Sequence, residues 1–288
     1  MLGGEEDAEM DEALSEDEQH AVVTRLRRDV AEAARTMNQR EGEYLVRVYH
    51  QQQRHRLALE AQLRSLGGAP SATLGFLVEQ ARTLEAQVRR SLDLWTRDHP
   101  PSQWARGIVG VGPVVTAELR AYTHIEHCPT VGHLWAFAGL DPTKTWEKGQ
   151  RRPWNPDFKR LAFILGDSFT KVRGKPGDIY GQVYFDRRAY EEAKNLAGDY
   201  AEQAAASLGR VGKETGAHKH YAEGRLPPGR IFLRAKRYAV KLFLAHYHHV
   251  TYVHVHGTEP PLPYPVVHLG HAHVFAPPAF KKTGTEDV

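Results

Sequence analysis

Residues 107–122 have the sequence GIVGVGPVVTAELRAY, in which three glycines lie within six residues, directly before a predicted helix. Glycine lets a backbone approach another group closely and the N-terminus of a helix favours negative charge, so this combination is typical of a phosphate site. A dinucleotide site would need Gly-x-Gly-x-x-Gly after a buried strand, whereas here the order is reversed and no apolar strand precedes it. No Gly-Lys-Ser/Thr follows, so the pattern does not indicate a mononucleotide loop either.

The order apolar-Gly-apolar-Gly at 109–112 instead predicts a helix-hairpin-helix whose second helix begins at Pro113. In such a motif the backbone N–H groups of the turn contact a phosphodiester without reading the base sequence. We therefore expect DNA-backbone contacts at Gly110, Val111, Gly112 and Val114. The alternative is a tight glycine turn that only packs two helices together.

Helical periodicity dominates the rest of the chain and no convincing series of strands is present. One long helix is expected from about 17 to 66, and a second after the Gly/Pro break at 67–71, which together form a long antiparallel, coiled-coil-like hairpin. Further helices are expected near 113–122, 130–138, 156–169, 178–208 and from 230 onward, with a polar loop at 209–229. The fold class is therefore all-α. The expected organisation is a disordered acidic head (1–16), a helical arm (17–101), a helix-hairpin-helix domain (102–253) and an extended His/Pro-rich tail (254–288).

The charge distribution is uneven along the chain. The net charge is +3, but the first 20 residues contain nine Asp or Glu and no Lys or Arg, so the remainder carries +12. A basic body indicates a polyanionic partner, most commonly nucleic acid, although solubility alone would also explain it. The single cysteine, the absence of a signal-like segment and the lack of a long apolar run predict a cytoplasmic, nucleoid-associated protein with no membrane partner.

Two clusters of cations are candidates for DNA binding. The loop and helix start at 144–160 interleave basic residues with Trp146 and Trp154, which could stack on unpaired bases. A later helix has cations spaced 4, 3 and 4 residues apart, which places them in one stripe. A solvated loop and a water-facing stripe remain the alternatives. The candidate DNA contacts of these clusters are Lys148, Arg151, Arg152, Lys159, Arg160, Arg230, Arg234 and Arg237, and Lys241 completes the stripe.

The order of these motifs resembles the C-terminal (transposase-20 type) domain of the insertion-sequence one-ten / one-sixteen / nine-oh-two family transposases. After the glycine turn, LWAFAGLDP at 134–142 is similar to the family's helix that ends in Gly-Leu-x-Pro, KGQRR at 148–152 to its basic Gly-rich loop, and RAKRYAVKLFLAHY at 234–247 to its closing helix. The clear match covers about 107–170, with a weaker one over 175–250. The resemblance implies DNA transposition or recombination, double-stranded DNA as partner and a structured guide RNA.

Two features depart from that family. The roughly 106 residues before the motif are predicted helical, so they do not resemble the family's N-terminal RNase-H-like domain with its four metal-binding carboxylates. The loop after Gly-Leu-x-Pro contains no serine where the family has its nucleophile; Thr143 and Thr145 are its only hydroxyls, and the nearest serine, Ser168, lies within the next helix and is not expected to be catalytic. We therefore expect a DNA-binding, transposase-related protein without its own catalytic centre. The alternatives are an active serine-type recombinase that works with a separate nuclease chain, and a non-catalytic helical scaffold or DNA-repair accessory protein.

Histidines are concentrated near the C-terminus. The pairs His254-x-His256 and His271-x-His273 have spacings that suit a metal ion, but no cysteine is near them. Alternating histidines also fit one face of an extended segment, so a metal site is not the expectation. No cofactor is predicted, and a divalent metal would enter only through a partner nuclease domain. The helical arm would allow a homodimer.

Overall fold

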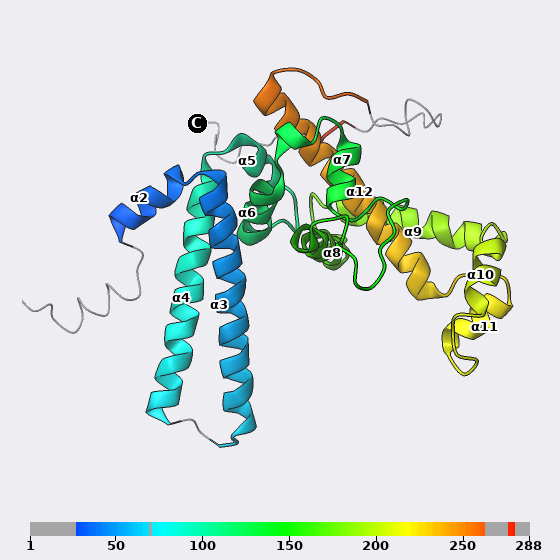
Figure 1. Cartoon of the computed structure of the whole chain (residues 1–288), viewed down its shortest axis with the longest axis horizontal. Coiled ribbons are helices and arrows are strands. Elements are labelled where there is room, and N and C mark those ends of the chain that lie inside the picture. The colour runs from blue at the N-terminus through cyan, green and yellow to red at the C-terminus, as the bar shows by residue number, and fades with distance from the viewer. Residues whose placement is uncertain (1–26, 69–70, 263–275, 280–288) are drawn as a thin grey trace, which may run out of the picture. The chain divides into compact units, whose positions relative to one another are not determined.

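The computed structural model describes residues 27–68, 71–262 and 276–279, and in these residues the chain is all-α, as the periodicity predicts, with no strand. It divides into two compact units at the last turn of helix α4, between Trp95 and Thr96. The first unit contains α2 (Arg28–Thr36), α3 (Gln39–Ser65) and α4 (Ala72–Arg97). The second unit contains α5 (Pro100–Arg106), α6 (Pro113–Tyr122), the 3₁₀ turn η1 (Ile125–His127), α7 (Val131–Phe137), α8 (Pro156–Lys171), α9 (Tyr180–Leu196), α10 (Ala201–Leu208), α11 (Gly216–Ala222) and α12 (Pro228–His256) (Figure 1).

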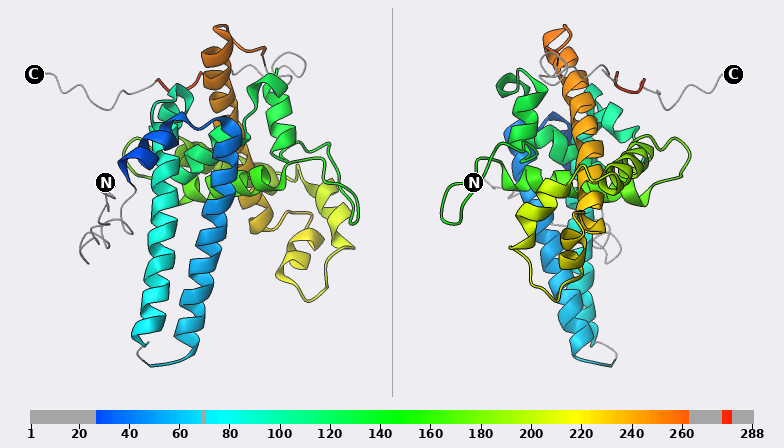
Figure 2. Two further views of the ribbon diagram at one scale, coloured as in Figure 1. Left: turned by 60° about the vertical axis from the view of Figure 1, so that its left-hand side comes forward. Right: turned by 90° about the vertical axis from the view of Figure 1, so that its right-hand side faces the viewer.

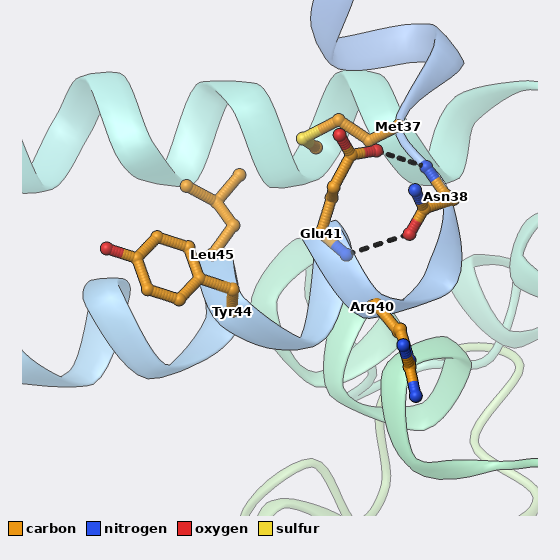
Figure 3. Close-up of a pocket in the computed structure, with 6 residues that line it drawn as sticks. All are labelled: Met37, Asn38, Arg40, Glu41, Tyr44 and Leu45. Atoms are coloured by element: carbon orange, nitrogen blue, oxygen red, sulfur yellow. Dashed lines mark hydrogen bonds between the residues drawn. The ribbon is translucent and has the colours of Figure 1, made fainter.

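The first unit differs from the expected single helix over 17–66, because the chain breaks at Met37 and Asn38. The side chain of Asn38 accepts a hydrogen bond from the N–H of Glu41 at 3.1 Å, and the Glu41 carboxylate accepts from the N–H of Asn38 at 2.7 Å (Figure 3). This reciprocal capping box starts α3 and therefore separates it from α2. The indole of Trp95 donates to the carbonyl of Met37 at 2.8 Å and fixes the break.

Helices α3 and α4 lie side by side in Figure 1 and in the left view of Figure 2, and they run antiparallel. Polar contacts follow the pair along its length: the Tyr49 hydroxyl donates to Glu85 at 3.3 Å, and Arg82 pairs with Glu60 at 2.9 Å. Gly42 lies against the Trp95 ring, where a Cβ atom would come within 2.2 Å of the indole. The pair therefore combines apolar burial with ion pairs. The buried side chains between the helices include Val46, Val78, Val88 and Leu92.

In the second unit, α12 is the central helix and packs against α9, α8, α7 and α5. Aromatic side chains fill its core: the rings of Phe243 and Tyr180 are 5.2 Å apart, and those of Phe243 and Phe169 are 5.4 Å apart. Trp104 from α5 stacks on Phe243 at 5.8 Å. Burial of large aromatic rings contributes most of the apolar area available in a core of this kind, so α12 is the element that positions the others.

Three stretches of this unit differ from the sequence-based expectation. The helix expected over 178–208 is two helices, α9 and α10, and the expected loop 209–229 contains α11. The reason is a small core in which Tyr221 and Leu226 pack with Tyr200, Ala204 and Ile231. Residues 254–256, expected in an extended tail, form the last turn of α12, which ends at Gly257 in the left-handed conformation.

Candidate nucleic-acid interface

The glycine turn joins two short helices, α5 and α6. Gly110 has φ of +95°, a region that L-residues rarely adopt, and the N–H of Val111 closes the turn onto the carbonyl of Ile108 at 3.0 Å. Val111 is 5% exposed, so its side chain belongs to the core and only its backbone could face a ligand. Val114 is half-buried. Gly112 precedes α6 with no heavy atom within 4 Å of the position of a Cβ, so the approach to its backbone is open.

Ser168 is tied to this turn. Its hydroxyl donates to the carbonyl of Gly110 at 2.5 Å, from a position 58 residues later in the chain. A Cβ at Gly110 would lie 3.0 Å from that hydroxyl and 3.2 Å from Val172. The structure therefore gives Ser168 a packing role. It also shows that Gly110 is needed for the contact between the turn and α8.

The basic loop before α8 exposes Lys148, Arg151 and Arg152. The guanidinium of Arg152 lies 5.1 Å from the ring of Trp146, whose indole donates to the carbonyl of Gln150 at 2.7 Å. Trp146 is 36% exposed, so part of its ring is open to a ligand. The expected interleaving of cations and tryptophans is thus present as direct contacts.

Lys159 and Trp154 form a second contact at the start of α8. The ammonium of Lys159 is 3.7 Å from the centre of the Trp154 ring, a cation–π geometry. Gly139, which ends α7 with φ of +65°, packs beneath them: a Cβ there would lie 2.9 Å from Lys159 and 3.0 Å from Trp154. The glycine of the Gly-Leu-x-Pro motif therefore positions a lysine, and one face of Trp154 is occupied by that lysine rather than open for a base.

The cation stripe of α12 divides into two parts. Arg234 pairs with the buried carboxylate of Glu191 at 2.7 Å, so its guanidinium is held within the fold. Lys241 instead lies 4.0 Å from the ring of Trp135, and the Trp135 indole donates to the carbonyl of Lys241 at 3.0 Å. Arg230 and Arg237 are exposed. Arg234 is therefore a structural residue, whereas Arg230 and Arg237 are exposed and Lys241 is half-buried.

Electrostatics connect the loop with α12. Burial lowers the pKa of Lys159, and Arg237 and Arg152 lower it further. Burial also lowers the pKa of Arg237, with Arg230 and Arg234 as the other causes. For Lys241, burial and Arg237 outweigh the opposing effect of Asp141 and lower the pKa. Segments far apart in sequence thus meet in one cationic face, which we define as Arg152, Lys159, Arg230, Arg237 and Lys241.

Arg160 does not join this face. Its guanidinium pairs with Glu118 of α6 at 2.9 Å, and Glu118 is 1% exposed. Removing a cation from a buried carboxylate leaves an uncompensated charge, so Arg160 holds α6 against α8. Of the candidate cations predicted from the sequence, Arg160 and Arg234 are therefore committed within the fold.

The histidines of α12 also have structural partners. His246 shares a 2.7 Å hydrogen bond with the Tyr180 hydroxyl, and His248 contacts the carbonyl of Cys128 at 2.7 Å; both rings are buried. His254 lies edge-on to His99 at 5.5 Å. Because they are two residues apart on a helix, His254 and His256 point in different directions. They therefore do not share one face, as they would in an extended segment.

His271 and His273 lie outside the described residues. Within 27–68, 71–262 and 276–279, no group of three His, Cys, Asp or Glu side chains is placed to hold a metal ion. None of the helices described there has the length and apolar character needed to cross a bilayer. No protein-family model, curated protein or solved structure matches the chain.

Sequence reasoning identified most members of the cationic face but not its assembly. It treated the loop and the α12 stripe as separate sites, and it did not assign a role to Trp135, the ring on which Lys241 rests. The available signal was the tryptophan in LWAFAGLDP together with the glycine four residues later. Only the packing of α7 against α12 shows that this motif borders the stripe.

Proposed function

We propose that this protein binds the DNA backbone in a transposition or recombination reaction, as a transposase-related module that lacks its own catalytic centre. The observation that carries the proposal is the cationic face. Lys159 belongs to α8 and Arg237 to α12, and the charge of Arg237 helps to lower the pKa of Lys159. A bound polyanion relieves such repulsion, and phosphate neutralisation supplies most of the affinity in non-specific DNA binding.

The glycine turn supports the same proposal through a second contact. The backbone at Gly112 is open and precedes the N-terminus of α6, where a phosphate oxygen would be favoured by the helix dipole. Such a contact positions a duplex and carries no sequence information. The two surfaces therefore support binding to DNA of many sequences.

The link to transposition depends on the resemblance of 107–170 to the transposase domain. The alternative of an active serine recombinase receives no support from Ser168, because its hydroxyl is used to hold Gly110. In the proposed role, strand cleavage would belong to a separate nuclease chain, with its own divalent metal. The alternative of a pure scaffold predicts that the cationic face has no nucleic-acid partner.

The proposal is tested by fluorescence anisotropy with a labelled duplex of about 20 base pairs across a salt series. We expect the logarithm of the association constant to fall linearly with the logarithm of the salt concentration. The double variant Arg237→Gln/Lys241→Gln removes two phosphate contacts, so the slope should decrease by roughly 2. The parent chain would show no salt-dependent binding if the scaffold alternative holds.

The matched control is Arg210→Gln/Lys213→Gln. These exposed cations follow α10 in the same unit, and their removal changes the net charge by the same amount. We expect the control to keep the parent slope. If the slope of the salt dependence decreased equally in both double variants, net charge rather than the cationic face would control binding. That result would refute the assignment of the site.

A further inference from the structure

Two exposed tyrosines, one on α9 and one on α12, contact the same guanidinium, that of Arg187. Tyr190 of α9 is 50% exposed and Tyr238 of α12 is 36% exposed. The guanidinium carbon of Arg187 lies 4.7 Å from the centre of the Tyr190 ring and 4.5 Å from that of Tyr238. The other tyrosines named in this unit's core are at most 7% exposed: Tyr122, Tyr180, Tyr184, Tyr200, Tyr221 and Tyr247.

Arg187 is fixed in this position from below. Its guanidinium pairs at 2.7 Å with the carboxylate of Glu191, a residue that is 1% exposed. Glu191 also holds Arg234 at 2.7 Å and accepts a hydrogen bond from the Tyr200 hydroxyl. A carboxylate with these partners anchors the guanidinium, so the two rings are supported by a group that cannot swing away.

Apolar ring surface in water is unfavourable, so Tyr190 and Tyr238 would gain by stacking a partner. A partly exposed ring that is supported by a guanidinium can stack a nucleobase, and arginine planes do the same. Tyr238 directly follows Arg237, so a strand whose bases reach the rings would have its phosphates near the cationic face. Bases in a duplex are already stacked on each other and cannot use such rings.

We propose that Tyr190, Arg187 and Tyr238 form a stacking platform for unpaired bases of single-stranded nucleic acid. The inference rests on the proposed function, since it takes the cationic face as the backbone contact. It adds the substrate class: a strand, or a strand end, that is not base-paired. The same chemistry fits single-stranded DNA and RNA.

The test compares three labelled probes by fluorescence anisotropy with the full chain: an oligo(dT) 20-mer, an oligo(U) 20-mer and a 20-base-pair duplex. In the double variant Tyr190→Ala/Tyr238→Ala, we expect affinity for a single strand to fall about ten-fold or more for each ring lost. Duplex affinity should change by less than about three-fold, because phosphate contacts remain. The variant Tyr190→Phe/Tyr238→Phe keeps the rings and should bind the single strand like the parent.

The matched control is Phe185→Ala. Phe185 is another exposed ring of α9 with its own guanidinium, Arg173, at 4.6 Å, but it lies five residues before Tyr190 and so on a different side of the helix. This control should not alter binding. Circular dichroism of each variant verifies that the helices are retained. The oligo(dT) and oligo(U) arms show which nucleic acid is preferred.

The possible outcomes separate the two proposals. If the parent binds duplex and single strand and only the cation variants weaken binding, the stacking platform is refuted while the proposed function stands. Equal weakening of duplex and single strand in the alanine variant also refutes the platform. If the parent binds no nucleic acid, the proposed function fails and the platform fails with it. Selective loss of single-strand affinity, rescued by phenylalanine, supports the platform.

Discussion

The glycine turn offers a direct way to separate folding from binding, because its two central glycines have different surroundings. Gly110→Ala places a Cβ in a left-handed conformation, which costs about 1–2 kcal/mol for a non-glycine residue. The new atom would also lie 3.0 Å from the Ser168 hydroxyl, whose hydrogen bond to the Gly110 carbonyl is worth about 0.5–1.5 kcal/mol. We expect a total loss of about 2–3 kcal/mol.

In a unit of this size, a loss of about 2–3 kcal/mol lowers the thermal midpoint by roughly 4–12 °C, measurable by circular dichroism at 222 nm. Gly112→Ala is the internal control. Its φ of −91° suits any residue and its Cβ meets nothing within 4 Å, so we expect less than about 1 kcal/mol of change, from the weaker helix cap. A Gly110→Ala protein that melts with the parent would refute the packing role assigned to this turn.

The remaining predictions concern Ser168 and His99. Ser168→Ala should destabilise the fold by about 1 kcal/mol in urea denaturation and leave duplex affinity unchanged; a loss of DNA affinity without a loss of stability would contradict its packing role. Burial, aided by Arg120 and His254, lowers the pKa of His99 from 6.5 to about 3. Unfolded His99 takes up a proton near pH 6.5, whereas folded His99 stays neutral. The stabilising contribution of His99 is therefore fully present above pH 6.5 and is lost as the pH falls below it. The thermal midpoint should therefore fall from pH 7 to 5.5 and fall less in His99→Gln, while equal slopes would exclude His99 as the cause.

The sequence predicts helices well where periodicity and breakers agree. The helix expected near 113–122 is α6 (Pro113–Tyr122), since a glycine turn and Pro113 mark its start. The break at Asn38 was missed, although Asn38 and Glu41 form a recognisable capping box, because the apolar pattern continues across it. Helix α11 was missed because its sequence is polar, and only packing of Tyr221 in a small core stabilises it.

The sequence predicts which residue types form the candidate site, but it does not predict which of them form ion pairs within the fold. A stripe with spacings of 4, 3 and 4 identifies cations on one side of α12. It cannot show that Glu191 holds Arg234 or that Arg237 acts on Lys159. The same holds for Arg160, whose partner Glu118 lies 42 residues away. Ion pairs between distant segments depend on tertiary packing, so local spacing carries no information about them.

The two proposed contact surfaces lie on opposite sides of α8, which leads to a further test. Ser168, which holds the glycine turn, and Lys159, in the cationic face, are nine residues apart on this helix. Nine residues correspond to about 13–14 Å along the axis and about half a turn around it. The glycine turn and the cationic face would therefore contact separate stretches of DNA backbone.

Independent contacts should be additive. In a double-mutant cycle of Gly112→Ala and Arg237→Gln on duplex affinity, we expect the two losses to sum within about 0.5 kcal/mol, because the residues share no partner. If Arg237→Gln removed the effect of Gly112→Ala, the two groups would contact the same phosphates and the separation inferred from α8 would be wrong. If the losses are additive and the affinity also depends on the length of the duplex, one DNA molecule contacts both sides of the unit. A duplex too short to reach both surfaces should then lose the contribution of Gly112 and keep that of Arg237.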